Sequence, residues 1–130
     1  MRTPTKQLKE AYDELMRRYI RDIECWGKAN VSVSYRHFEL SAYGDINRMI
    51  IDMVHYDTWI LSLDVSQYGV IVNRVRGWSN TDRDNMNGLL RLLNCPSEFY
   101  RRDYDLMCDL STGAFIGARS PIGTGTGVLA

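Results

Sequence analysis

The segment that most constrains the fold of this chain spans residues 55–93, where two strand-like runs precede a helix-like pattern. Residues 55–64 and 69–76 are rich in β-branched and aromatic side chains, and a short polar break separates them. Runs of this kind, bounded by turn-forming residues, are typical of β-strands. The pattern that follows has Thr81 as the expected helix cap and ends before Pro96, which cannot continue a helix. The segment therefore predicts strand, turn, strand and helix.

The helix of this segment has a buried stripe that consists of Met86, Leu89, Leu90 and Leu93. Gly88 lies inside the same pattern, where glycine costs about 1 kcal/mol relative to alanine. We therefore expect another element to pack closely against the helix at Gly88.

A second apolar stripe recurs at steps of three and four near the N-terminus, formed by Leu8, Ala11, Tyr12, Leu15, Tyr19, Ile23 and Trp26. This spacing places the stripe on one face of a helix. Gly27 stands where a helix commonly ends. We predict a helix over residues 4–26.

The other elements follow from shorter patterns. Residues 31–40 and 100–110 alternate in polarity and each predicts one strand, although a helix that starts at Ser97 competes with the second. Residues 44–54 fit a short helix capped by Asp45 or an extension of the next strand, and we favour the helix. The glycine-rich residues 114–130 predict a flexible C-terminal segment.

This order of elements predicts an α+β fold, with a small, mainly antiparallel sheet and two main helices packed on one face. Residues 1–113 are expected to form a single domain, which agrees with a length of 130 residues and a hydrophobic content of 45%.

The charge balance gives little support to a nucleic-acid-binding domain. Sixteen basic residues match sixteen acidic ones, whereas such domains usually carry a basic excess. The N-terminus has no apolar run typical of a secretory signal, and no apolar run approaches the roughly 20 residues of a membrane span. The odd number of cysteines, Cys25, Cys95 and Cys108, predicts free thiols in a reducing setting. We expect a cytoplasmic protein that contacts no membrane.

The known catalytic and cofactor motifs are absent from the sequence. Gly123–Gly127 lacks the lysine and the following helix of a phosphate-binding loop, and whether it binds a ligand stays open. The chain has no GxSxG nucleophile motif, and no cysteine lies beside a histidine in sequence. We therefore expect no catalytic residue, no metal and no cofactor.

Two weaker constellations remain as alternatives. His55 lies between Asp52 and Asp57, so a His–Asp pair is conceivable, but a strand histidine bonded to a neighbour fits better. Asp103, Asp105 and Asp109 share one face of the last predicted strand and resemble a cation site, although solvent-facing strand residues give the same pattern.

Aromatic residues and arginines give the clearest functional signal, because three Trp and eight Tyr are many for a small domain. Trp, Tyr and Arg dominate the energetic centres of binding interfaces. The predicted recognition residues lie on or beside the strands, and they are Tyr56, Trp59, Arg74, Arg76, Trp78, Tyr100, Arg101, Arg102 and Tyr104.

Residues 55–93 also resemble a known group of sequences. The run Tyr56-Asp57-Thr58-x-Ile60, followed by Trp78-Ser79-x-Thr81-x-Arg83 and Leu89-Leu90, is similar to small uncharacterised proteins of bacteriophages and plasmids. Their pattern is Ser-Tyr-x-Thr-x-Ile-Ala, then Tyr-Ser-x-Thr-Thr-Ser-x-His at a helix start. This chain has His55 in place of the first Ser, Leu61 in place of the Ala, and Asn85 near the His. The resemblance implies an origin in a mobile element and carries no activity.

We therefore expect a non-enzymatic phage or mobile-element protein that binds a host protein or complex. Its most concrete form is a counter-defence inhibitor of the anti-CRISPR type. The alternatives are a nucleic-acid-associated domain and a small metal-dependent hydrolase. A homodimer also stays open, because the edge strand of a sheet can pair with a second copy.

Overall fold

The structure of the protein is a computed structural model, and it describes residues 4–26, 29–76, 79–102, 105–109, 115–118 and 127–128. The elements, in chain order, are α1 (Lys6–Trp26), β1 (Ala29–Tyr35), β2 (Phe38–Gly44), β3 (Arg48–His55), β4 (Thr58–Ser66), β5 (Gly69–Val75), α2 (Asn80–Leu92), β6 (Phe99–Arg102), β7 (Asp105–Asp109), β8 (Phe115–Ala118) and β9 (Gly127–Val128).

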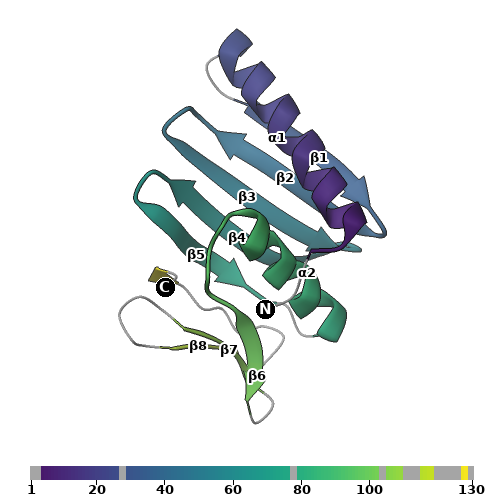
Figure 1. The fold of residues 1–130 in the computed structure, drawn as a ribbon, viewed down its shortest axis with the longest axis vertical. Helices are drawn as coiled ribbons and strands as arrows, with labels where there is room; N and C mark the ends of the chain where they lie inside the picture. The colour runs from purple at the N-terminus through teal and green to yellow at the C-terminus, as the bar shows by residue number, and fades with distance from the viewer. Residues whose placement is uncertain are drawn as a thin grey trace.

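The main sheet is an antiparallel meander in which β1 to β5 pair in chain order, and β9 adds to β5 as the sixth strand. A second sheet, of order β6-β7-β8, lies apart from it (Figure 1). Both helices lie on the same face of the main sheet, with α1 over β1 and β2 (Figure 1). The predicted α+β class, with two helices on one face of a mainly antiparallel sheet, is confirmed.

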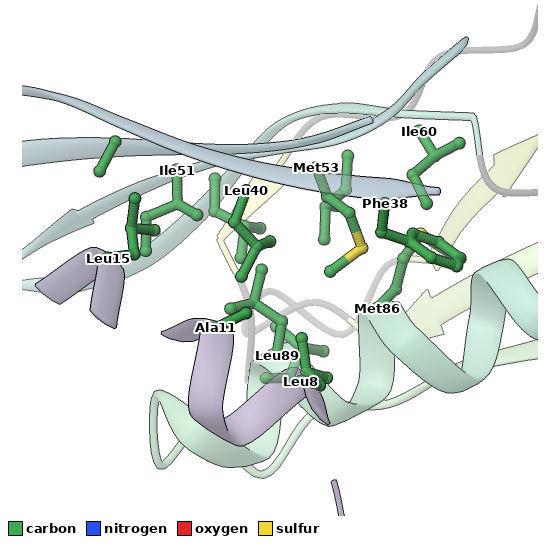
Figure 2. Packing of buried hydrophobic residues seen from close by; sticks show 14 of the residues in the cluster. Leu8, Ala11, Leu15, Phe38, Leu40, Ile51, Met53, Ile60, Met86 and Leu89 are labelled. Carbon is green, nitrogen blue, oxygen red and sulfur yellow. The ribbon is translucent and has the colours of Figure 1, made fainter. Parts of the chain in front are cut away.

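The hydrophobic core lies between the two helices and this face of the sheet. Leu8, Ala11 and Leu15 of α1 and Met86 and Leu89 of α2 point toward a set of strand side chains that comprises Phe38, Leu40, Ile51, Met53 and Ile60 (Figure 2). Successive strand residues point to opposite faces, so burial of every second residue fixes the register of each strand. In β2, for example, Phe38, Leu40 and Ala42 are buried.

Both predicted helices are confirmed, and their ends follow from side-chain caps. Thr5 Oγ1 accepts the backbone N–H of Leu8 at 3.2 Å in the first turn of α1. Ser79, rather than the predicted Thr81, caps α2: its hydroxyl accepts the N–H of Asp82 at 3.0 Å, while the Asp82 carboxylate accepts the N–H of Ser79. Thr81 is wrong as a cap because a residue inside the first turn has already adopted helical geometry.

The close packing expected at Gly88 is confirmed. A Cβ atom added to Gly88 would lie 2.5 Å from Cδ2 of Leu8, which is buried in the core. The glycine therefore allows the two helices to approach each other at Leu8.

Two predicted strands and one predicted short helix differ from the structure. Residues 31–40 form the hairpin of β1 and β2, with Arg36 and His37 in the turn. Residues 44–54 contain β3 and no short helix; Asp45 Oδ1 accepts the N–H groups of Asn47 and Arg48, at 2.8 and 3.1 Å, and so closes a turn. Residues 100–110 contain parts of the paired strands β6 and β7.

The predicted flexible segment contains β8 and β9, and the remainder of residues 114–130 lies outside the described residues. Within the part of the chain that the structure describes, no helix has the length and apolar character needed to cross a membrane.

Candidate functional site

The face of the main sheet opposite the helices carries a row of small and charged polar side chains, which we call the open face. The strand register places Ser32, Ser41, Asp52, Ser62 and Arg74 side by side across β1 to β5. Their chain neighbours, among them Leu40, Ile51 and Leu61, are fully buried on the helix side. Because side chains alternate along a strand, the polar row points away from the helices. No described helix covers this face.

Two β-bulges bring the predicted residues Trp59 and Arg74 together on the open face. In β4, Leu61 pairs with Met53 and Trp59 pairs with Val54, so Ile60 is the extra residue. A second irregularity between β4 and β5 pairs Ser62 with Arg74. An extra residue reverses the facing of the residues that precede it. Ile60 therefore stays buried, with 1% of its surface exposed, while Trp59 turns outward.

The Trp59 ring and the Arg74 guanidinium form a cation–π pair. The guanidinium carbon lies 5.0 Å from the centroid of the ring, within the usual range of about 6 Å. The indole N–H of Trp59 donates to the carbonyl of Leu61 at 3.2 Å, which fixes the ring orientation. The ring remains 37% exposed. The arrangement gives a fixed aromatic and cationic surface that is accessible from the open face.

Two carboxylates sit in the same face in different environments. Asp64 is buried, and Nε and Nη2 of Arg48 both donate to its Oδ2, at 2.6 and 2.5 Å. Oδ1 of Asp52 is buried and has no hydrogen-bond partner among the described residues. Burial raises the pKa of Asp52 above its usual value, and the polar side chains of Ser62, Tyr43 and Trp59 nearby oppose this rise. The charge of Asp64 is thus balanced by Arg48, whereas one oxygen of Asp52 has no partner among the described residues.

Replacement of Asp52 by asparagine should stabilise the protein at neutral pH. A raised pKa in the folded state means that the stability from protonated Asp52 is present at low pH and is lost as the pH rises through that raised pKa. An amide has no charge to desolvate, so we expect a gain of about 1 kcal/mol at neutral pH that disappears near pH 3. Urea unfolding of both proteins at the two pH values measures this difference.

The matched control is Asp57→Asn, which removes the same charge from an exposed turn residue. We expect no measurable stabilisation from it. A gain of equal size in Asp57→Asn, or a gain in Asp52→Asn that persists at low pH, would contradict a specific cost of burying Asp52.

The remaining predicted recognition residues are dispersed. Tyr56 lies in the β3–β4 turn and is 64% exposed. Arg76 follows β5, and its backbone N–H donates to Ile60 O at 2.7 Å. Tyr100, Arg101 and Arg102 belong to β6 in the second sheet, so they do not extend the open face. Trp78 and Tyr104 lie outside the described residues.

The two weaker constellations also change in the structure. His55 pairs with Asp82, whose Oδ1 lies 2.7 Å from its Nδ1, and not with the flanking Asp52 or Asp57. Asp105 and Asp109 are in β7, while Asp103 lies outside the described residues. Among the residues that the structure describes, no three His, Cys, Asp or Glu side chains gather in a way that could hold a metal ion.

Sequence reasoning missed the row of polar side chains on the open face and the two β-bulges. The row is visible in the sequence as alternate polar positions, but its members come from separate strands and only the register brings them together.

Comparison with family models, with curated proteins and with solved structures gives no match to this chain.

Proposed function

We propose that this protein is a non-enzymatic binding protein that contacts a partner protein through the open face of its sheet. The observation that carries the proposal is the Trp59–Arg74 pair, which stacks on β4 and β5 where no described helix covers the sheet. Trp and Arg are enriched among the residues that dominate binding energy. A pair that is already ordered loses little side-chain freedom when it binds, so more of its contact energy appears as affinity.

The centre of the open face supports a partner that supplies a hydrogen-bond donor. The buried Oδ1 of Asp52 lacks a described partner, and a donor from the bound protein would remove the cost of leaving it unpaired. Ser41 and Ser62 flank Asp52 across the sheet, and because Ser62 is itself buried, a donor reaches Oδ1 of Asp52 only when the side chains around it move. The exposed Ile71, 41% accessible on neighbouring β5, adds apolar area beside this polar centre.

The proposed partner is a host protein or complex, and the proposed origin is a phage or another mobile element. This part of the proposal is supported by the resemblance of residues 55–93, which include both Trp59 and Arg74, to small phage and plasmid proteins. Inhibition of a host defence complex, in the manner of anti-CRISPR proteins, is its most concrete form. Such a protein acts by occupying a surface, and it needs no catalytic group.

Affinity purification from nuclease-treated bacterial lysate, followed by mass spectrometry, tests the proposal. We expect the wild-type protein to retain one host complex. Trp59→Ala and Arg74→Glu should each bind the complex about thirtyfold more weakly, because loss of a central contact costs about 2 kcal/mol. The control Tyr68→Ala removes an aromatic side chain that is 89% exposed in the β4–β5 turn, outside the open face, and should behave as wild type.

Two results would count against this function. Recovery of no stoichiometric partner would remove the support for a host target, and equal recovery by Trp59→Ala and Tyr68→Ala would remove the open face as the contact. The stacked Trp59 and Arg74 also suit an unpaired nucleic-acid base, which is the second candidate. Enrichment that depends on nucleic acid, and binding that weakens steeply with salt, would favour that candidate instead.

A further inference from the structure

The two histidines of the chain, His37 and His55, line one pocket at the end of the main sheet, on the side of the helices, whereas the Trp59–Arg74 pair lies on the open face. The pocket has a volume of about 560 Å³, which falls in the range of small-molecule sites. Tyr35, Arg36, Tyr56 and Asn85 contribute to its wall. The wall therefore combines residues from the tips of two hairpins with residues from α2, and we call it the hairpin-tip pocket.

A continuous series of ring contacts, two of them stacked and the one between His55 and Tyr56 tilted, forms one side of the hairpin-tip pocket. Phe38 and His55 are nearly parallel, with centroids 4.0 Å apart and an angle of 2° between the rings. Tyr56 follows at 4.8 Å from His55, and His37 stacks on Tyr56 at 4.7 Å. Tyr56 remains 64% exposed although it touches both histidines. The result is an aromatic surface that is accessible to a planar ligand.

A hydrogen bond with Asp82 fixes the orientation of the His55 ring in this series. The carboxylate oxygen Oδ1 of Asp82 lies 2.7 Å from Nδ1 of His55, and the capping box of α2 holds the same carboxylate in place. Because Nδ1 is paired with the carboxylate, Nε2 is the ring nitrogen that remains for a ligand. His55 is thus a pre-oriented polar group in the wall of the pocket.

The two hairpin turns that border the pocket contain residues in the left-handed backbone region, which is unfavourable for residues other than glycine. Arg36 and His37 have φ values of 39° and 68°, and Tyr56 has 52°. Two-residue hairpin turns with positive φ favour Asn and Gly, and neither turn of the pocket contains one of these residues. The N–H of Tyr56 donates to the carbonyl of His37 at 2.8 Å, so the two tips are joined. Strained residues of this kind gather at ligand sites more often than elsewhere.

The opposite side of the pocket is polar and internally satisfied. The Tyr35 hydroxyl donates to Asn85 Oδ1 at 3.2 Å, and Asn85 Nδ2 donates to the carbonyl of Thr81 at 2.9 Å. Burial raises the pKa of Tyr35, so its hydroxyl keeps its proton. Arg36 is exposed at the rim and forms no ion pair with a described carboxylate. Glu39 is the acid nearest to Arg36 in sequence, and neither Glu39 nor Asp57 is part of the pocket wall.

We propose that the hairpin-tip pocket binds a small planar anion, namely an aromatic ring that carries a phosphate or carboxylate group. The ring lies against Tyr56 and His37, and the guanidinium of Arg36 pairs with the anionic group. Nε2 of His55 forms a hydrogen bond with a polar group of the ligand. Nucleotides and aromatic carboxylates share this chemistry. The site is independent of the open face, because it uses neither Trp59 nor Arg74.

Proton NMR of the histidine Cε1–H signals tests this site directly, since the chain has two histidines and both line the pocket. The probes are adenosine monophosphate, adenosine, benzoate and inorganic phosphate, and His37→Gln assigns the two signals. We expect a saturable shift of both signals with adenosine monophosphate or with benzoate. The probe that saturates shows whether the ligand is a nucleotide or an aromatic carboxylate. Adenosine should bind about tenfold more weakly than its monophosphate.

Two matched arginine variants locate the site. Arg36→Ala should weaken binding of the saturating probe by about tenfold, whereas Arg74→Ala on the open face should leave it unchanged. Absence of any saturable shift at millimolar probe, or equal shifts from inorganic phosphate alone, would overturn the proposal. An equal effect of the two arginine variants would do so as well. Failure of the host pull-down would leave this result unaffected, because it depends on a different face.

Discussion

Replacement of Leu40 by alanine should lower the free energy of unfolding by about 3 kcal/mol, the largest effect that we expect from a single substitution. Leu40 is fully buried in β2, and it points from the sheet toward the side chains of α1 (Figure 2). Truncation to alanine removes apolar contacts with the helix and leaves a cavity that the rigid sheet cannot close. Urea unfolding monitored by circular dichroism measures the loss.

Ile46→Ala is the matched control, because Ile46 is 82% exposed in the turn before β3. We expect its unfolding free energy to lie within about 0.5 kcal/mol of wild type. If the two variants unfolded at the same urea concentration, Leu40 would not lie in the core that joins α1 to the sheet.

Replacement of Asp82 by alanine should cost about 2 kcal/mol, because this side chain stabilises two elements at once. One carboxylate oxygen bonds the backbone N–H of its own cap residue, Ser79, and the other bonds His55 at the end of β3. Loss of a helix cap costs about 1 kcal/mol, and an unpaired, largely buried imidazole nitrogen adds a similar amount. Thermal and urea unfolding of Asp82→Ala measure the total.

Ser79→Ala separates the two contributions, since it removes the cap hydroxyl and leaves the Asp82–His55 bond intact. We expect it to cost about 1 kcal/mol, and Asp82→Ala to cost clearly more. A double-mutant cycle with His55→Ala then isolates the pair. Equal costs for Ser79→Ala and Asp82→Ala, with no coupling to His55, would show that this bond does not stabilise the fold.

The elements that sequence reasoning predicted correctly are those with a long local signal. The apolar stripe of α1 extends over several turns, and its members Leu8, Ala11, Leu15 and Tyr19 are buried as expected. Gly88 was also correctly interpreted, since a glycine inside a helix reflects a close neighbour. The turn at Arg36 and His37 was missed because neither residue is a turn former, and the register of the sheet imposes a positive φ on both.

The candidate sites were also predicted only in part. The sequence singled out Trp59 and Arg74, but it could not distinguish them from Arg101 and Arg102, which the fold places in another sheet. It offered Asp52 and Asp57 as conceivable partners of His55 and favoured a neighbour in the sheet, whereas the partner, Asp82, comes from the helix that follows β5. A side chain reaches a partner through space, and spacing along the chain reveals such pairs only within one helix or one strand.

The class of the fold, the two helices and the residues with which the helices enter the core could be predicted from the sequence, because burial of apolar side chains follows local periodicity. The open face and the hairpin-tip pocket arise only in the folded chain. Two bulges turn Trp59 outward beside Arg74, and strand pairing brings the tips that carry His37 and Tyr56 together. Both arrangements depend on hydrogen bonds between strands, which fix register only when the whole sheet has formed.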